Sequence, residues 1–254
     1  MELSKSILIS FFTLGASLAV AEDTPNLARE VKLRLEVNSE NAFSWIETQG
    51  TASEVCELYG QAVKDLYWLD KGAKSLVVIG SRGVSFCLEQ AIKFVDSEPT
   101  MANGFKAQAK TIAYNVAANT WPGWGDEGVI ISKSETEAGL EAAKLNLKLA
   151  EELKKPSDKI AAAYWLLSAM QLALDKFQES IASIDLSNIY ASQAGDKTVL
   201  AYNEGFKGLI FLASGNITGT EPFDSGVRKL KEIGSEDATF YVSQLATGKK
   251  IFVK

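Results

Sequence analysis

Residues 119–131, NTWPGWGDEGVII, hold side chains that could act on a ligand: Trp121, Trp124, Asp126 and Glu127. Carboxylates beside tryptophans are residue types that a glycan-processing hydrolase or lyase uses. Such an enzyme needs two carboxylates facing each other across a cleft, and adjacent residues rarely converge on one bond. The pair is also too small for a calcium site, and its spacing fits no EF-hand loop. Carboxylate-dependent catalysis is therefore the weakest of the functions that we consider.

The chain contains no histidine. This absence excludes Ser-His-Asp and Cys-His nucleophilic catalysis, HExxH-type metal sites and proton transfer by imidazole. No residue pattern calls for a cofactor. We therefore expect a protein that is not an enzyme and that needs neither cofactor nor metal.

Cys56 and Cys87 are the two cysteines of the chain. They fall in two predicted helices, about 52–70 and 73–95, at equal sequence distance from a break at Lys71-Gly72. In an antiparallel hairpin, equal distance from the turn places the two sulfurs at the same height. In an oxidising compartment this arrangement predicts a disulfide, and the alternative is two free thiols in the same hairpin core. The bond would close a loop of roughly 30 residues and stabilise the fold by about 3–4 kcal/mol in the chain-entropy model.

The N-terminal segment 1–21 has the order of a cleaved signal peptide. Lys5 precedes an apolar run from Ile7 to Val20, and small residues follow at Ala19 and Ala21. The run is short for a membrane span, although a membrane-anchoring helix is the alternative. We expect the mature chain to begin at residue 22, to have no later transmembrane segment, and to be periplasmic or secreted.

The composition favours a helical protein without a nucleic-acid partner. The formal net charge is −6 and the lysines are spread among the acids, without the basic run that a phosphate backbone requires. Only five prolines occur, and Ala, Leu, Lys and Glu dominate. Behind an N-terminal segment at 22–50, residues 51–254 are long enough for one continuous domain.

Apolar spacing predicts helices through most of this domain. Segment 22–50 is ambiguous, because VKLRLEV also alternates as a strand does. We expect N-caps near Ser53, Ser134, Ser157 and Asp224, and helix ends at Gly195, Gly215 and Gly234. The predicted helices cover about 52–70, 73–95, 101–119, 133–154, 157–175, 177–194, 197–214, 224–233 and 236–247.

A sequence repeat organises the second half of the chain. LAEELKKPSDKIA at 149–161 and IYASQAGDKTVLA at 189–201 share the order of helix end, polar turn and helix start. The two segments are 40 residues apart, and at this same spacing Ala161, Ser168 and Asp175 recur as Ala201, Gly208 and Gly215. Small residues at seven-residue steps let a neighbouring helix approach closely, as stacked hairpins require.

Residues 161–196 carry the motif by which the chain resembles the tetratricopeptide (TPR) repeat family. Tyr164 matches the family's early aromatic, Leu167 its leucine, and Ser168 the small residue that is usually glycine. Phe177 matches the aromatic that opens the second helix, Ser180 its close-contact position, and Ile184 the large residue one turn later. Departures are Gln171 for an aromatic, Ser187 for an alanine, and no closing proline near Ser192. The resemblance is clearest over residues 133–215. It implies an all-α single domain of antiparallel helical hairpins stacked as a TPR-like solenoid.

The resemblance also implies a concave surface formed by the first helix of each hairpin. Its positions include Trp165, Tyr202 and Leu209, and the surface is apolar rather than basic. It would either receive an apolar ligand or helix, or be filled by the C-terminal segment DATFYVSQL, the alternative that we favour. Trp121 and Trp124 likewise have two interpretations: they cap an open end of the core, or they form a recognition surface.

We therefore predict an exported, non-catalytic scaffold that binds a protein, a peptide or an envelope component. The candidate partner-binding residues are Trp121, Trp124, Trp165, Tyr202 and Leu209. The alternatives are an extracytoplasmic small-molecule (solute) binding protein, whose sign is an enclosed pocket, and the carboxylate-dependent glycan-processing enzyme.

Overall fold

A computed structural model describes residues 27–254, and the proposed signal peptide lies outside them. Every regular element between Leu27 and Lys254 is a helix. The α-helices are α2 (Leu27–Val37), α3 (Ser39–Glu47), α4 (Ala52–Asp70), α5 (Lys74–Phe94), α6 (Pro99–Asn119), α7 (Lys133–Glu152), α8 (Ser157–Ala173), α9 (Phe177–Ala194), α10 (Lys197–Ala213), α11 (Thr220–Ile233) and α12 (Glu236–Phe252), with short 3-10 helices η1 (Pro122–Trp124) and η2 (Ile217–Gly219).

The all-α prediction is confirmed for the part of the chain that the structure describes, and the ambiguous segment before residue 50 is helical. It forms α2 and α3, whose apolar side chains Ala28, Val31, Ala42 and Ile46 are buried. This helical pair packs on α4 and extends the domain toward the N-terminus. The helical periodicity therefore outweighs the alternation of VKLRLEV.

The glycines predicted at helix ends agree with the structure better than the predicted N-caps do. Gly195, Gly215 and Gly234 are left-handed, with φ of 70°, 81° and 67°, and each follows a helix as predicted. Two predicted N-caps are displaced along the chain. Thr51 and Ser132, not Ser53 and Ser134, accept the backbone N–H of Glu54 and Glu135 in reciprocal capping boxes.

Two other N-cap predictions were wrong. Ser157 is the first residue of α8, behind Pro156, and makes no capping bond there. Asp224 lies inside α11, which begins at Thr220 because η2 leads directly into it. Proline at position 222 is tolerated because the first helical turn has no intrahelical N–H bonds to lose.

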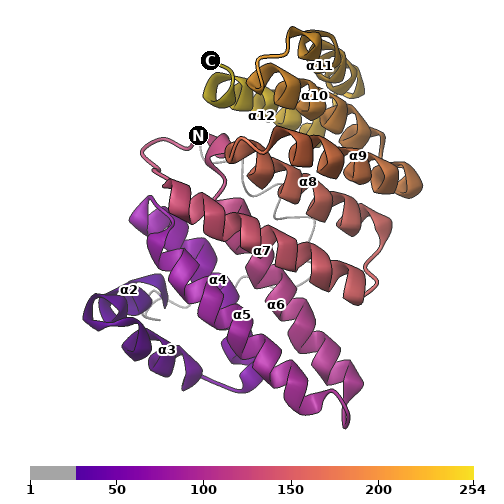
Figure 1. Cartoon of the computed structure of the whole chain (residues 1–254). Coiled ribbons are helices and arrows are strands. Elements are labelled where there is room, and N and C mark those ends of the chain that lie inside the picture. The colour runs from indigo at the N-terminus through magenta and orange to yellow at the C-terminus, as the bar shows by residue number, and fades with distance from the viewer. Residues whose placement is uncertain (1–26) are drawn as a thin grey trace.

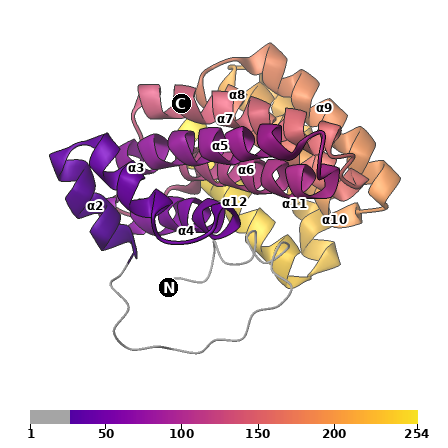
Figure 2. The ribbon, with the colours of Figure 1, turned by 90° about the horizontal axis from the view of Figure 1, so that it is seen from below.

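The helices pack in chain order. Figure 1 shows them following one another from α2 and α3 at one end to α11 and α12 at the other, each against the next. In Figure 2, the helical pair of α2 and α3 again lies at the opposite end from α9 and α10. Helices two apart also touch in places, notably α4 with α6 and α10 with α12. Such a series of neighbour contacts is compatible with a helical repeat fold.

The small residues of the sequence repeat lie at the closest helix crossings. Ser168 and Ser180 exchange hydrogen bonds across α8 and α9, with each hydroxyl donating to the other residue's carbonyl at 2.8 Å. At the equivalent place, a Cβ on Gly208 of α10 would clash with the backbone N of Phe223 and lie 2.7 Å from the Gly219 carbonyl. Both crossings need small residues, as predicted for this position of the repeat, whereas a Cβ on Gly215 would meet nothing within 4 Å.

The Cys56–Cys87 disulfide links α4 to α5. The sulfurs are at bonding distance and the two Cα atoms are 5.9 Å apart. Both side chains are buried. Equal distance from the turn at Lys71-Gly72 does place them side by side, as the hairpin argument predicts.

Helix α5 is long and apolar enough, by length and composition alone, to cross a membrane. It is nevertheless packed against α4 and α6 and joined to α4 through Cys87. These contacts are those of a core helix in a folded domain. That no transmembrane segment follows residue 21 stays a prediction.

Candidate binding groove

The five predicted partner-binding residues come together, but in the core. Trp121, Trp165, Tyr202 and Leu209 are each at most 5% exposed, and Trp124 packs against them. Trp121 lies edge-on to Trp124 at 4.9 Å and to Trp165 at 5.7 Å between ring centroids. In this arrangement the rings contact one another edge to face, which leaves little surface for a partner.

Helix α12 fills the apolar surface beside α10. Tyr241 stacks on Tyr202 at 4.2 Å between centroids, and the Tyr202 hydroxyl donates to the Gln244 side chain. Gly205 leaves space for Leu245, whose Cδ1 would lie 2.6 Å from a Cβ at that position. Of the two interpretations of this surface, the structure has the one in which the C-terminal segment occupies it.

The loop at 119–131 is fastened on both sides. Trp121 enters the C-terminal core, and the Gly123 carbonyl accepts a bond from Gln244 of α12 at 3.3 Å. On the other side, the Ile130 N–H donates to the Lys71 carbonyl at the α4–α5 turn. The loop is thus a joint between two buried clusters, one formed mainly by α2–α6 and the other by α7–α12.

The two carboxylates of this loop do not form a pair for catalysis. Asp126 accepts a 2.6 Å hydrogen bond from the buried Tyr67 hydroxyl, whereas Glu127 is exposed. Burial, and then this hydrogen bond, raise the pKa of Tyr67, so the phenol stays a proton donor to the carboxylate. Asp126 therefore has a structural partner in α4.

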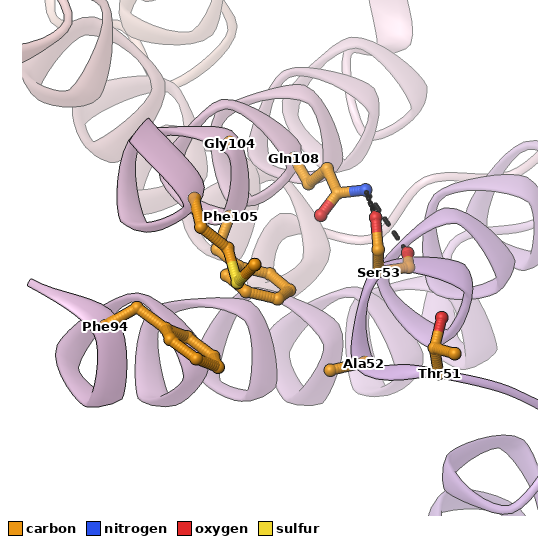
Figure 3. Close-up of a pocket in the computed structure, with 8 residues that line it drawn as sticks. Thr51, Ala52, Ser53, Phe94, Gly104, Phe105 and Gln108 are labelled. Atoms are coloured by element: carbon orange, nitrogen blue, oxygen red, sulfur yellow. Dashed lines mark hydrogen bonds between the residues drawn. The ribbon is translucent and has the colours of Figure 1, made fainter. Parts of the chain in front are cut away.

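An open apolar groove lies at the other end of α4, where the starts of α4 and α6 meet the end of α5. It holds about 530 Å³. Figure 3 shows Phe94 and Phe105 lining it, with Gly104 on the same helix as Phe105. The two phenyl rings stack at 5.9 Å between centroids. The lining residues are Thr51, Ala52, Ser53, Phe94, Met101, Gly104, Phe105 and Gln108.

Gln108 separates this groove from a second, more polar one between α4 and α6. Its amide donates to the Ser53 carbonyl at 3.2 Å and hydroxyl at 3.1 Å, as Figure 3 shows. The second groove holds about 400 Å³ and is lined by Glu57, Gln61, Lys64 and Asn115, among others. Together the two follow α4 and α6 along most of their length, with an apolar end and a polar end.

Apolar side chains extend beyond the groove onto the surface. Ile92, Val95 and Met101 are 73%, 48% and 42% exposed. They lie on either side of the α5–α6 turn, where Phe94 and Met101 enter the groove. Exposed apolar side chains near an open groove are a feature of interaction sites in soluble proteins. We call the groove and these three side chains the α5–α6 patch.

A buried lysine lies further along α6. Lys110 is 5% exposed, with its ammonium 5.9 Å from the Tyr114 ring centroid. Burial, followed by repulsion from Lys155 and Lys159, lowers the pKa of Lys110 to about 8. This part of α6 is therefore locally electropositive, in contrast to the acidic chain as a whole.

Sequence reasoning did not identify the groove residues. The available signal was the stretch IKFVDSEPTM at 92–101, whose apolar residues exceed what one buried helix stripe needs. A second signal was Asn103-Gly104 inside a predicted helix, because both residues disfavour helix interiors. Neither residue type is rare enough on its own to mark a site.

Within residues 27–254, no group of three or more His, Cys, Asp or Glu side chains is arranged to hold a metal ion. No model of a known protein family matches the chain, and no curated protein is similar to it. The site must therefore be interpreted from its own geometry: an open, apolar groove without a cluster of reactive groups.

Proposed function

We propose that the protein is an exported, non-catalytic TPR-like binding module that holds a peptide or a segment of a partner protein in the α5–α6 patch. The observation that carries this proposal is the apolar groove of about 530 Å³, lined by half-exposed Met101, with exposed Ile92 and Val95 close to its Phe94 in the sequence. Its openness to solvent favours a partner that lies across the surface over a solute enclosed between hairpins.

The TPR-like assignment is supported by packing at the motif positions. Ser168 and Ser180 occupy the small and close-contact positions of the repeat and meet across the α8–α9 crossing. Ala161 and its repeat equivalent Ala201 also lie at crossings: Ser187 donates to the Ala161 carbonyl at 2.8 Å, and a Cβ on Gly226 would lie 2.7 Å from the Ala201 carbonyl. These contacts repeat in the way that stacked hairpins require.

Export is supported by the disulfide together with the N-terminal sequence. Cys56 and Cys87 pair in the structure, and disulfides persist in periplasmic and extracellular proteins but rarely in the cytosol. The proposed compartment is accordingly the periplasm or the exterior of the cell.

The test is a selection of short peptides from a displayed random library on the mature chain. Binding of the selected peptides is then compared for wild type, Gly104→Gln and Gly104→Ala. A Cβ at residue 104 meets no atom within 4 Å, so alanine fits without a clash and the first side-chain atom of glutamine does so too. We expect Gly104→Gln, which obstructs the groove, to lower affinity at least about tenfold, while Gly104→Ala changes it little. Equal binding to all three proteins, or failure to select any peptide, would contradict the proposal.

A further inference from the structure

Gly104 has no packing role that explains it. Glycine is unfavourable inside a helix, and α6 continues to Asn119, well beyond this position. Several other helical glycines permit close approach: a Cβ on Gly80 would clash with Val116, and one on Gly83 would lie 2.6 Å from Tyr59, whereas one on Gly60 would meet only Ile112 at 3.7 Å. A Cβ on Gly104 would meet nothing within 4 Å. Gly104 instead lines the groove, where the absence of a side chain leaves open space.

The rim of the groove is more acidic than basic. Glu54 accepts hydrogen bonds from the backbone and hydroxyl of Thr51, which lowers the pKa of Glu54 and keeps its carboxylate charged at the rim. Glu57 lines the adjoining polar groove, which also holds Lys64 further along α4, and Asp96 and Glu98 lie in the α5–α6 turn.

The two lysines on the nearby parts of α5 and α6 already have polar partners. Lys93 donates to Gln90, and Lys106 pairs with Glu152 at 3.5 Å. The carboxylates of Glu57, Asp96 and Glu98 are exposed. The α5–α6 patch therefore combines an apolar floor with a negative border.

From these observations we infer that the partner segment is an amphipathic, cationic peptide or helix: large apolar side chains enter the groove over Gly104, and flanking Lys or Arg side chains face Glu57, Asp96 and Glu98. The inference rests on the proposed binding function and specifies the partner's chemistry. Complementary charge at a rim contributes mainly to specificity and association rate, while the apolar anchors contribute most of the affinity. The same acidic rim opposes docking onto an anionic lipid surface.

The experiment uses two short synthetic amphipathic peptides of equal length, one of Leu and Lys and one of Leu and Glu, titrated onto the mature chain by fluorescence anisotropy. We expect the Leu/Lys peptide to bind and the Leu/Glu peptide to bind at least about tenfold more weakly at low salt. Gly104→Gln should remove most of the Leu/Lys binding, and Gly104→Ala should preserve it.

Charge at the rim is tested separately, because any acidic protein attracts a cationic peptide. Glu57→Gln with Glu98→Gln should weaken Leu/Lys binding about three- to tenfold at about 50 mM salt and have little effect at about 500 mM. The matched control, Glu221→Gln with Glu232→Gln, removes the same charge from exposed positions on α11 and should have less effect.

Each of the following outcomes would overturn the inference. Equal binding of the two peptides would show that the groove has no charge preference, and loss of binding in the α11 control would show non-specific attraction. Groove-dependent sedimentation with phosphatidylglycerol vesicles would instead identify an anionic membrane as the partner. If a library peptide binds in a Gly104-dependent way and the Leu/Lys peptide does not, the inferred chemistry fails while the binding function stands. If neither binds, both fail.

Discussion

The hydroxyl of Tyr67 donates to the Asp126 carboxylate at 2.6 Å, joining residues that are 59 positions apart. Tyr67 is buried on α4, and Asp126 belongs to the loop between α6 and α7. Beside them, the Ile130 N–H donates to the Lys71 carbonyl at 3.2 Å. The Tyr67–Asp126 bond therefore fixes the long α6–α7 loop against the first half of the domain, and it gives Asp126 a structural role.

Tyr67→Phe should lower the free energy of unfolding by about 1–2 kcal/mol, because it removes a buried donor to a charged acceptor. The measurement is urea unfolding of Tyr67→Phe, Asp126→Asn and the double variant. The cycle should give a coupling of about 1 kcal/mol between the two side chains. Additive single effects would mean that the bond contributes nothing, and hydrogen exchange at residues 126–130 should then be unchanged in Tyr67→Phe.

Trp121→Ala should destabilise the fold by about 3–5 kcal/mol, because the side chain is 1% exposed and its removal leaves a large cavity. It contacts Trp165, Phe206 and Phe252 from three different helices. Thermal unfolding followed by circular dichroism measures the loss. Trp68→Ala, at a tryptophan that is 55% exposed, is the control and should cost less than about 1 kcal/mol. Similar small losses in both variants would restore the surface interpretation of Trp121.

Local patterns predicted the helices because most of them are set by signals within a few residues. The apolar periodicity, the glycines at 195, 215 and 234, and the spacing of Cys56 and Cys87 around one turn all depend on short stretches. The N-caps of α4 and α7 were misassigned because several Ser and Thr residues compete there, and only geometry decides which hydroxyl caps the helix.

The candidate site was harder to predict because exposure depends on contacts between distant segments. Trp121 and Trp165 are of a residue type that is common in recognition surfaces. In this structure, α12 and the α6–α7 loop pack over the region around them. Nothing within their own helices encodes that contact. The groove at Gly104, in contrast, exists because no segment of the described chain packs there. Sequence patterns identify apolar side chains without showing which ones remain uncovered.

Gly208→Ala should destabilise the domain by roughly 1–3 kcal/mol or more, whereas Gly104→Ala should stabilise it by up to about 1 kcal/mol. The two glycines are both inside helices, so their helix propensities change equally. They differ in packing: a Cβ on Gly208 would overlap the Phe223 backbone, and one on Gly104 would meet open space. Urea unfolding of both variants measures the difference. Equal effects of the two substitutions would contradict the close crossing of α10 and α11.

Lys110 makes the stability of the fold dependent on pH. Burial, and then Lys155 and Lys159, lower the pKa of Lys110 from its ordinary value of 10.5 to about 8. Below pH 8 the lysine is charged in both the folded and unfolded states, and the folded state carries the full cost of burying that charge. Between pH 8 and 10.5 the unfolded chain binds more protons, so this lysine's contribution to the free energy of unfolding rises with pH.

Lys110→Met should therefore stabilise the protein at about pH 7 by about 1–3 kcal/mol, since it replaces a buried charge with an apolar side chain of similar length. The advantage over wild type should shrink as the pH rises toward about 10, where wild-type Lys110 is neutral when folded. Urea unfolding at a series of pH values measures both effects. Lys133→Met, at a lysine that is 82% exposed, is the control and should leave the pH dependence unchanged. If Lys110→Met instead destabilised the protein at neutral pH, the ammonium would be stabilising the fold through favourable contacts that outweigh its burial.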